Sequence, residues 1–297
     1  MLETALDYQE MKHDEKKRRN QTATNTTFHL MRGGRHKFTM QELLGGDTHV
    51  VGNVGLGTSF LSLISERLIM FFKRLESVTN DEKLDFHGHM MLLGNLSHPN
   101  LLPYLACYHY KDERFLVTDF VINGSLATHL HDEQKSDESR LDWATRLKII
   151  KGVASGLGYL YQEFPTLSLP HGHLKSSSVP VDDAFNPLLT DYGLLPIIKK
   201  EEAEKLMVAY KSPEFNLTTK KTDVWCLGML ILEIMTGGMG KKRVEDMATT
   251  WVNSIKREEW RQEVFDKNMK WEMDSEIETI DLLEIGLHCC EPDYERR

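Results

Sequence analysis

The spacing of apolar residues changes near the middle of the chain, from patterns typical of strands to patterns typical of helices. The first half contains short β-rich segments that are separated by glycines or charged residues. We predict strands within residues 50–60, 67–75 and 115–120. Residues 81–96 carry apolar side chains at helical spacing, which predicts a helix between the second and the third of these segments.

Longer helices are predicted in the second half. Residues 143–162 and 222–236 have the pattern of long amphipathic or buried helices, and residues 282–289 indicate another. A small β-rich part followed by a larger helical part is typical of an α+β, two-lobed fold. We therefore expect a small N-terminal lobe over residues 37–121 and a larger helical C-terminal lobe over residues 122–297.

The residues before these lobes have a different pattern. They are polar, lack apolar periodicity and contain the basic run KKRR at residues 16–19. We interpret residues 1–36 as a flexible, juxtamembrane-like arm. If a longer product carries a membrane anchor before this arm, the basic run could lie against anionic lipid headgroups.

Composition and charge narrow the function classes. Of 297 residues, 40% are hydrophobic and 27% are charged, so we expect a packed core. The formal net charge of −9 argues against nucleic acid as a partner. The cysteines form no C-x-x-C pair, and no apolar run reaches the ~18 residues of a membrane helix. We expect a cytoplasmic domain with reduced thiols, or one at the cytoplasmic face of the plasma membrane if it belongs to a longer receptor.

Several motifs follow one another in the order of the protein-kinase landmarks. The sequence is HPNLLPYLACYHYKDERFLVTDFVINGSL at residues 98–126, LDWATRLKIIKGVASGLGYLY at 141–161 and HGHLKSSSVPVDD at 171–183. From about Phe38 to its C-terminus, the chain resembles plant leucine-rich-repeat receptor-like kinases, especially the pollen receptor-like group. The resemblance implies a two-lobed kinase fold that uses ATP and Mg²⁺ to phosphorylate serine or threonine side chains of proteins.

The glycine-rich loop of the family corresponds to the segment that begins at Gly52. Gly52 and Gly57 are retained, and glycines allow backbone N–H groups to come close to phosphates. Val54 replaces the second glycine, and its branched side chain resists positive φ and close approach. A plain β-hairpin turn is the alternative interpretation of this segment.

The phosphate-binding lysine of the family corresponds to Lys73 in the sequence MFFK. The resemblance implies that Lys73 would hold the α- and β-phosphates of ATP. His89 stands where the family has the glutamate that pairs with this lysine, and a neutral imidazole cannot form that ion pair. We hypothesise that Lys73 pairs with Asp191 instead.

Two substitutions concern the adenine base. Phe71 replaces the alanine that covers adenine in the family, and Pro180 replaces a leucine that packs beneath it. We hypothesise that Phe71, with Ser59 nearby, fills the adenine space and completes the core without ATP. The alternative is a shifted strand register, in which Phe71 lies in the core and the pocket is normal.

The catalytic loop differs from the family most clearly. The family pattern H-R-D-x-K-x-x-N corresponds to HGHLKSSS at residues 171–178. His173 replaces the aspartate that accepts the proton of the substrate hydroxyl, and loss of a general base typically costs ~10²–10⁴-fold in rate. A histidine could act as a base because its pKa is about 6.5, but we favour a loop residue with no role in proton transfer. Ser178 replaces the asparagine that holds the second magnesium ion.

Metal binding and regulation are affected at two further positions. Asp191, in the sequence DYG, remains a candidate ligand for one Mg²⁺. Gly172 replaces the arginine that pairs with an activating phosphate in the family. Residues 194–211 contain a single hydroxyl side chain, that of Tyr210. We therefore expect a domain that is not switched on by phosphorylation of this segment.

Residues that support the fold are retained. The resemblance implies structural roles for His171 and for Asp223, whose buried carboxylate would brace the backbone of the catalytic loop. It also implies that Arg297 pairs with Glu214 of the sequence SPE. Kinase domains usually continue with one more helix at this point, so we expect a truncated C-terminal lobe.

Three interpretations of the function follow. The first is a catalytically inactive pseudokinase, with no cofactor expected, that serves as a signalling scaffold or allosteric partner of receptor kinases or cytosolic signalling proteins. The second is a weakly active ATP-dependent serine/threonine kinase, which the retention of Lys73 and Asp191 favours. The third is metal binding by the His-x-His pairs, although no cysteine or carboxylate completes a ligand spacing. These pairs are His87 with His89, His129 with His131, and His171 with His173.

Overall fold

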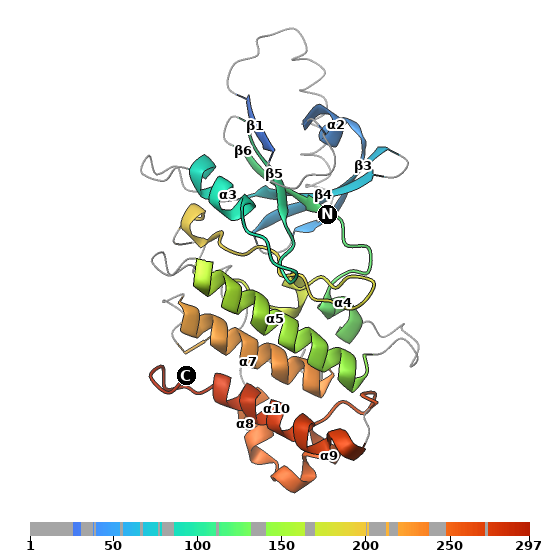
Figure 1. Ribbon diagram of the computed structural model, residues 1–297, viewed down its shortest axis with the longest axis vertical. Helices are drawn as coiled ribbons and strands as arrows, with labels where there is room; N and C mark the ends of the chain where they lie inside the picture. The colour runs from blue at the N-terminus through green and yellow to red at the C-terminus, as the bar shows by residue number, and fades with distance from the viewer. Residues whose placement is uncertain are drawn as a thin grey trace. The chain divides into compact units, whose positions relative to one another are not determined.

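The computed structural model contains two compact units, whose helices and strands are drawn in Figure 1. The first unit consists of Met1–Ser97, Leu102–Phe120 and Ile197–Lys199, and the second of His98–Leu101, Val121–Pro196 and Lys200–Arg297. The structure describes residues 26–30, 38, 40–53, 56–65, 68–76, 78, 86–110, 113–131, 141–163, 170–199, 201, 212–213, 219–237, 248–270 and 273–297.

The first unit is built on a six-stranded antiparallel sheet with the strand order β1-β5-β6-β4-β3-β2. The strands are β1 (Thr26–Leu30), β2 (Asp47–Asn53), β3 (Gly57–Ser65), β4 (Leu68–Leu75), β5 (Tyr104–Tyr110) and β6 (Glu113–Asp119). The helices of this unit are α2 (Met40–Gly45) and α3 (Phe86–Gly94), and α3 contacts β5. The predicted strand at residues 50–60 is in fact the end of β2 and the start of β3.

Part of the segment that we interpret as an arm forms a strand. Within residues 1–36, Thr26–Leu30 forms β1 and pairs with β5, from Thr26 opposite Tyr110 to Leu30 opposite Ala106. The β-branched and aromatic residues of TTFHL favour extended backbone. The outer edge of β5 supplies the N–H and C=O groups that such a strand needs. A partner so distant in sequence leaves no trace in the local spacing of apolar residues.

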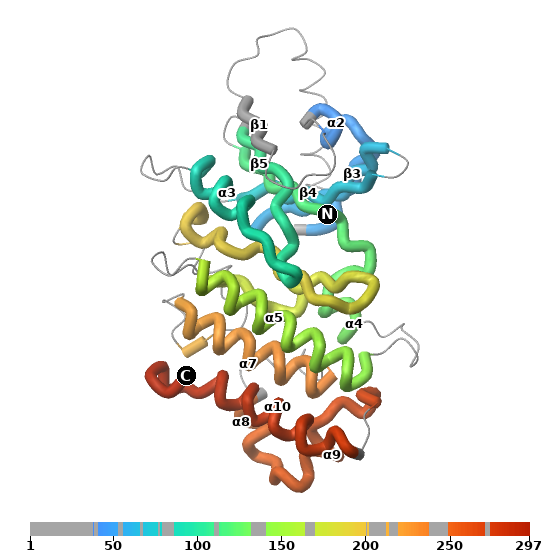
Figure 2. The backbone as a smooth tube through the Cα atoms, in the orientation of Figure 1, coloured from blue at the N-terminus to red at the C-terminus, as the bar shows by residue number. Residues whose placement is uncertain are grey.

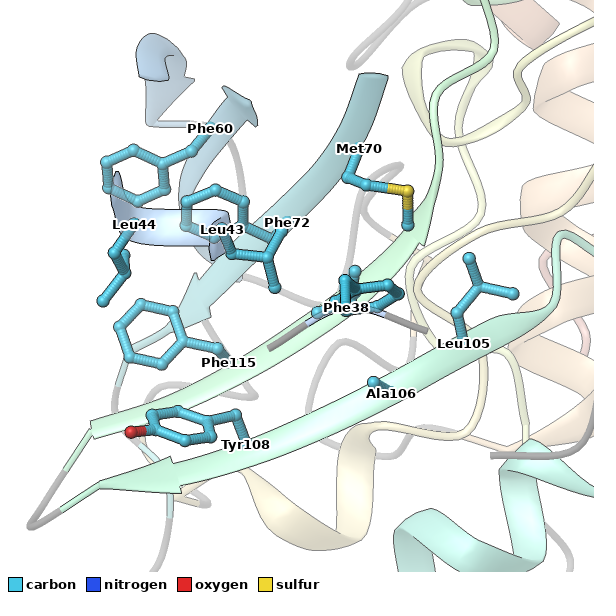
Figure 3. Close-up of a cluster of buried hydrophobic side chains, with 11 residues drawn as sticks. Phe38, Leu43, Leu44, Phe60, Met70, Phe72, Leu105, Ala106, Tyr108 and Phe115 are labelled. Atoms are coloured by element: carbon cyan, nitrogen blue, oxygen red, sulfur yellow. The ribbon is translucent and has the colours of Figure 1, made fainter. Parts of the chain in front are cut away.

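The core of the first unit lies on one face of this sheet (Figure 3). Side chains alternate along β4, so that Met70 and Phe72 are buried in the core whereas Phe71 is only half-buried. The Phe72 ring stacks on that of Phe60, with the ring centroids 4.9 Å apart. Helix α2 contributes Leu43, which is fully buried in the same cluster.

The second unit is mainly helical. Figure 2 shows α7 between α5 and α10, and α7 contacts both helices. The helices are α4 (Leu126–His131), α5 (Trp143–Glu163), α7 (Lys220–Thr236), α8 (Ala248–Ser254), α9 (Trp260–Glu263) and α10 (Glu276–Cys289). Short 3₁₀ turns are η2 (Ser176–Ser178), η3 (Leu195–Ile197), η5 (Arg257–Glu259) and η6 (Met273–Ser275). Of the helices that the structure describes, none is both long and apolar enough to cross a membrane.

Helix α7 is the most buried helix of the second unit, as expected for a segment that is apolar on all sides. It begins at a capping box, in which the Thr219 side chain accepts a hydrogen bond from the backbone N–H of Thr222. It ends at Gly237, whose φ of 68° lies in the left-handed region. A Cβ at Gly228 would lie 2.6 Å from Cys290 Sγ, so this glycine lets the end of α10 pack closely on α7.

Candidate active site

The first unit carries the two glycines that the sequence assigns to a phosphate-binding loop. Gly52 lies in β2, where the pairing with β3 shifts between Val50 and Gly52. Gly57 begins β3 with a φ of 147°, and a Cβ there would lie 1.9 Å from the carbonyl oxygen of Arg74 on β4. The close approach of the two strands therefore requires a glycine at this position, whether or not a nucleotide binds. Val54 lies outside the described residues.

Lys73 and Phe71 lie on the sheet face opposite the core. In the register of β3 and β4, Lys73 is opposite Ser59 and Phe71 is opposite Leu61. Phe72, between them, is the residue that packs in the core. The alternative register, with Phe71 in the core, is therefore wrong, because a shift of one residue would exchange the two faces. Lys73 itself is largely buried, with 8% of its surface exposed.

His89, at the position of the family's glutamate, lies on α3 and is partly exposed. His87 precedes it by two residues on the same helix, so the two residues lie on different sides of α3. Within the described part of the chain, no group of three or more histidine, cysteine, aspartate or glutamate residues could hold a metal ion. The His-x-His pairs therefore provide no recognisable metal site there.

The start of the catalytic loop, in the second unit, is hydrogen-bonded to the carboxylate of Asp223, a residue of α7. Asp223 Oδ2 accepts hydrogen bonds from the His171 backbone N–H at 2.6 Å and the Tyr161 hydroxyl at 3.0 Å. Its Oδ1 accepts the Gly172 backbone N–H at 2.9 Å. Complete burial raises the pKa of Asp223 to about 6, although the three donors act in the opposite direction. The carboxylate thus fixes two consecutive peptide groups of the loop.

At the positions that would carry out the reaction, backbone groups of His173 and the side chain of Ser178 are bonded within the loop. His173 is only 1% exposed, its backbone N–H donates to His171 Nδ1 at 3.3 Å, and its carbonyl oxygen lies 2.9 Å from Ser178 Oγ. Ser178 Oγ also accepts the Lys175 backbone N–H at 3.0 Å and lies 2.9 Å from the Lys175 carbonyl oxygen. A hydroxyl has one hydrogen and two lone pairs. That of Ser178 therefore uses its hydrogen and one of its lone pairs within the loop.

The backbone is left-handed at two of the positions that the sequence analysis singled out. Gly172 has a φ of 75° and Asp191 a φ of 61°. Glycine adopts this conformation without cost, and aspartate is one of the few other residues that tolerate it. The arginine that the family has in place of Gly172 would be strained here. Tyr210 and Glu214, which belong to the predicted regulatory segment, lie outside the described residues.

His171 and Asp191 lie near each other in the second unit. Burial lowers the pKa of the His171 imidazole to about 4, although the Asp191 carboxylate and nearby backbone groups act to raise it. His171 is therefore neutral at physiological pH. Asp191 is 8% exposed and precedes Tyr192, which is fully buried. The predicted pairing of Asp191 with Lys73 joins residues of different units and stays a prediction.

Arg297 lies on the N-terminal part of α7. Its guanidinium donates hydrogen bonds to the carbonyl oxygen of Glu291 at 2.9 and 3.1 Å and to that of Lys221 at 3.4 Å. The same group lies over the Trp225 ring, 4.9 Å from its centroid. These contacts attach the last residues of the chain to α7. The predicted partner, Glu214, is not among the described residues.

Pro180 follows Ser178 by two residues and forms an isolated β-bridge with Ser125. Its carbonyl oxygen accepts the Leu188 backbone N–H at 2.8 Å, and the residue is half-buried. Pro180 is thus part of a short hydrogen-bonded structure within the second unit. Its place beneath an adenine base stays a prediction.

The sequence did not single out a polar cluster that supports the catalytic loop. Glu233 Oε1 of α7 accepts a hydrogen bond from Ser176 Oγ at 2.8 Å and lies 2.6 Å from Nε2 of His131 on α4. Glu233 is 6% exposed, so both partners compensate for the burial of its carboxylate. The signal was present, because Glu233 is the only charged residue of residues 224–236. A buried carboxylate in such a helix requires partners from other elements.

The chain is similar to known protein kinases along most of its length. The family model described as protein tyrosine and serine/threonine kinase matches residues 39–297. A probable LRR receptor-like serine/threonine-protein kinase of Arabidopsis thaliana is 44% identical over 96% of this chain and 43% of its own length. Pollen receptor-like kinase 4 of the same plant is 46% identical over 88% of this chain and 40% of its own length. The chain thus spans less than half the length of these relatives.

Two solved structures share the fold. The kinase domain of maize SIRK1 (sucrose-induced receptor kinase 1), bound to AMP-PNP, has a TM-score of 0.77 and 28% identity and covers 91% of this chain and 95% of its own. The pseudokinase domain of BIR2, an immune regulator of the RLK/Pelle family, has a TM-score of 0.74 and 26% identity and covers 95% of this chain and 88% of its own. One similar structure holds a nucleotide analogue and the other is a pseudokinase. The fold alone therefore does not separate an active domain from an inactive one.

Proposed function

Because the chain belongs to the protein tyrosine and serine/threonine kinase family, we propose that it is a pseudokinase domain that serves as a signalling scaffold or allosteric partner of receptor kinases. The observation that carries this proposal is the hydrogen bonding inside the catalytic loop. At the position of the family's metal-binding asparagine, the Ser178 hydroxyl bonds backbone groups of the loop, and at the position of the catalytic aspartate stands the buried His173. The loop keeps its backbone support while the groups that perform the reaction are replaced.

The replacement at position 173 affects proton transfer. A general base must come within hydrogen-bond distance of the hydroxyl whose proton it takes. His173 is 1% exposed, and both its backbone N–H and its carbonyl oxygen are bonded within the loop. An imidazole is neutral or positive, so it does not supply the negative charge of an aspartate. Loss of this base accounts for a reduction of ~10²–10⁴-fold in rate.

The replacement at position 178 affects metal binding. Magnesium prefers oxygen ligands in a nearly octahedral arrangement, and kinases hold two such ions through an aspartate and the catalytic-loop asparagine. The Ser178 hydroxyl is directed at three backbone groups of the loop instead. We infer that the short Ser178 side chain, bonded in this way, does not replace the asparagine as a ligand of the second Mg²⁺. Asp191 remains a candidate for one ion, consistent with weak binding of Mg²⁺ and ATP at most.

Phe71 supports the same proposal from the first unit. It lies two residues before Lys73 on β4, so the two side chains are neighbours on one face of the sheet. The phenyl ring is half-buried there, where the family has a small alanine. We propose that this ring takes the space of the adenine base.

The second candidate is a weakly active ATP-dependent serine/threonine kinase. The retention of Lys73 and Asp191 favours it, because these residues contact phosphates and metal in the family. A neighbour with a similar fold, the SIRK1 kinase domain, is bound to AMP-PNP. Substrate-assisted transfer or His173 would then replace the missing aspartate.

The proposed partners are proteins. The relatives of the chain are receptor-like kinases, and the similar BIR2 pseudokinase is an immune regulator. We propose that the domain binds receptor kinases or cytosolic signalling proteins. We place it in the cytoplasm, or at the cytoplasmic face of the plasma membrane as part of a longer receptor.

Transfer of radiolabelled phosphate from ATP tests the proposal. The chain and its Lys73→Ala variant are incubated with Mg²⁺, labelled ATP and a general protein substrate. We expect the same background signal from both, because the chain lacks the base and the second metal ligand. A signal more than about tenfold above that of Lys73→Ala would favour the active kinase instead.

Thermal unfolding in the presence of Mg-ATP tests the role of Phe71 separately. A ligand that binds the folded state raises the melting temperature with its concentration. We expect no such rise for the chain, and a clear one for Phe71→Ala, which restores the small residue of the family. A rise for the unchanged chain would contradict a filled adenine space, and Lys73→Ala serves as the control for specific nucleotide binding.

A further inference from the structure

The outer strand β2 differs in composition from β5, the strand next to the other outer strand, β1. The edge formed by β2 contains the exposed side chains of the acidic Asp47 and of His49, with Asp47 Oδ1 3.3 Å from His49 Nε2, and an irregular register between Val50 and Gly52. Charges and bulges are the features by which edge strands avoid pairing with other molecules. The β5 strand has the sequence YLACYHY, without lysine, arginine, acid, proline or glycine. This composition is typical of segments that readily add another strand.

β1 covers the β5 edge. It pairs with every residue from Ala106 to Tyr110, so β5 has a neighbour on both sides. Ala106 and Tyr108 belong to the core, and Cys107 between them is 1% exposed. Without β1, the backbone N–H and C=O groups of β5 that point away from β6 would face solvent.

β1 pairs with one neighbouring strand, whereas β5 pairs with two. β1 has five residues and, as the last strand of the sheet, pairs on one side only. For such a segment, the net gain from backbone hydrogen bonds is similar in size to the entropy lost by ordering the residues. β5 in contrast pairs with β6 on its other side and contributes to the core. β1 can therefore leave while β5 stays in place.

We propose that β1 is a detachable cover and that the uncovered β5 edge pairs with the β5 edge of a second copy of this chain. The edge already accepts an antiparallel strand in the form of β1. Two identical edges related by a two-fold axis pair in the same antiparallel manner and form a closed dimer. No charged residue of β5 opposes this contact. The arm before the domain would thus control whether two copies associate through their sheets.

Phe28→Pro in the full chain tests the proposal. Proline removes a backbone donor from the middle of β1 and disfavours its pairing. At low protein concentration, we expect amide hydrogen exchange at those of residues 106–110 whose N–H groups point to β1 to be at least about tenfold faster than in the unchanged chain. At higher concentration, sedimentation should detect a dimer that the unchanged chain and a Phe28→Val control, which keeps a strand-forming residue, do not form.

The double variant Phe28→Pro with His109→Lys tests whether β5 is the contact surface. A lysine in the middle of an edge strand opposes pairing, so we expect this variant to be monomeric with fast exchange. A synthetic peptide of residues 24–32 should also return Phe28→Pro to a monomer. Unchanged exchange in Phe28→Pro, fast exchange without a dimer, or a dimer that persists with His109→Lys would each overturn the proposal.

A second measurement does not depend on the folding of a variant. A labelled peptide of residues 24–32 is titrated against the unchanged chain. It can occupy the β5 edge only when β1 leaves that edge, so we expect saturable binding that weakens in His109→Lys. No binding at millimolar peptide would overturn the detachable cover.

Discussion

The start and the end of the catalytic loop are held in different ways. At the start, a carboxylate from another helix, Asp223 of α7, accepts two backbone N–H groups and the Tyr161 hydroxyl. At the end, the loop is held by its own residues, because Ser178 Oγ forms hydrogen bonds with backbone groups of His173 and Lys175. The first arrangement depends on packing between distant segments, and the second only on residues within one turn.

This difference shows how a loop can keep its shape after its reactive groups change. Replacement of the buried Asp223 would lower the free energy of unfolding strongly, because three donors would lose their acceptor. Position 178 needs only a short side chain with an oxygen to close the turn, and serine meets that need without the reach of an asparagine. Structural residues are thus retained for a reason that is independent of catalysis.

Substitution of Asp223 should have the largest effect. We expect Asp223→Ala to lower the free energy of unfolding by about 3–5 kcal/mol, because it leaves buried donors unsatisfied and creates a cavity. Asp223→Asn keeps an oxygen acceptor and should cost less. Urea unfolding measures both, and a cost below about 1 kcal/mol for Asp223→Ala would show that the loop does not depend on this carboxylate.

The pH dependence of stability should reveal the two buried groups at the start of the loop. The pKa of His171 is lowered from 6.5 to about 4, so its contribution to stability is present above pH 6.5 and is lost as pH falls toward 4. The pKa of Asp223 is raised from 3.8 to about 6, so its contribution is present below pH 3.8 and is lost as pH rises through 6. The two trends oppose each other in the same window.

His171→Asn separates these two trends. We expect the stability of the unchanged chain, relative to this variant, to rise by up to about 3 kcal/mol between pH 4 and 6.5, because only the His171 contribution is removed. Urea unfolding at several pH values measures the difference. A constant difference across this range would contradict a buried neutral imidazole.

Ser178 should matter less than Asp223. We expect Ser178→Ala to lower the free energy of unfolding by about 1–2 kcal/mol, since the Lys175 N–H and two carbonyl groups lose a local partner. Exposed Ser177→Ala, one residue away, is a matched control and should change little. Equal effects of the two substitutions would mean that the turn does not need the Ser178 hydroxyl.

Substitution of Gly172 tests the backbone conformation between the two ends of the catalytic loop. Its φ of 75° disfavours any side chain, so Gly172→Ala should cost about 1 kcal/mol in urea unfolding. A stabilising effect of this substitution would indicate that the loop has a different backbone conformation in solution.

The smallest effect is expected for the activity of His173→Asp. This variant restores the family's base but leaves Ser178, His89 and Phe71 unchanged. We expect phosphate transfer to stay at the level of the Lys73→Ala control. A large gain would mean that position 173 alone accounts for the loss of activity.

The sequence predicted much of the fold because many elements have strong local patterns. The α+β, two-lobed kinase fold and the resemblance to receptor-like kinases are confirmed. Helices α5 and α7 start and end within two residues of the predicted bounds. β1 was missed, because its pairing with β5 joins segments about 80 residues apart and leaves no local signal. The polar cluster around Glu233 was missed for the same reason.

The sequence by itself determined which reactive side chains are present, because identity at positions 73, 89, 173, 178 and 191 can be read directly. The tertiary structure decided what these side chains contact. Only the register of β4 separates Phe71 from the core, and only the fold of the loop directs Ser178 toward its own backbone. Hydrogen bonds and burial depend on groups brought together from distant segments, so local sequence patterns identify the groups but not their partners.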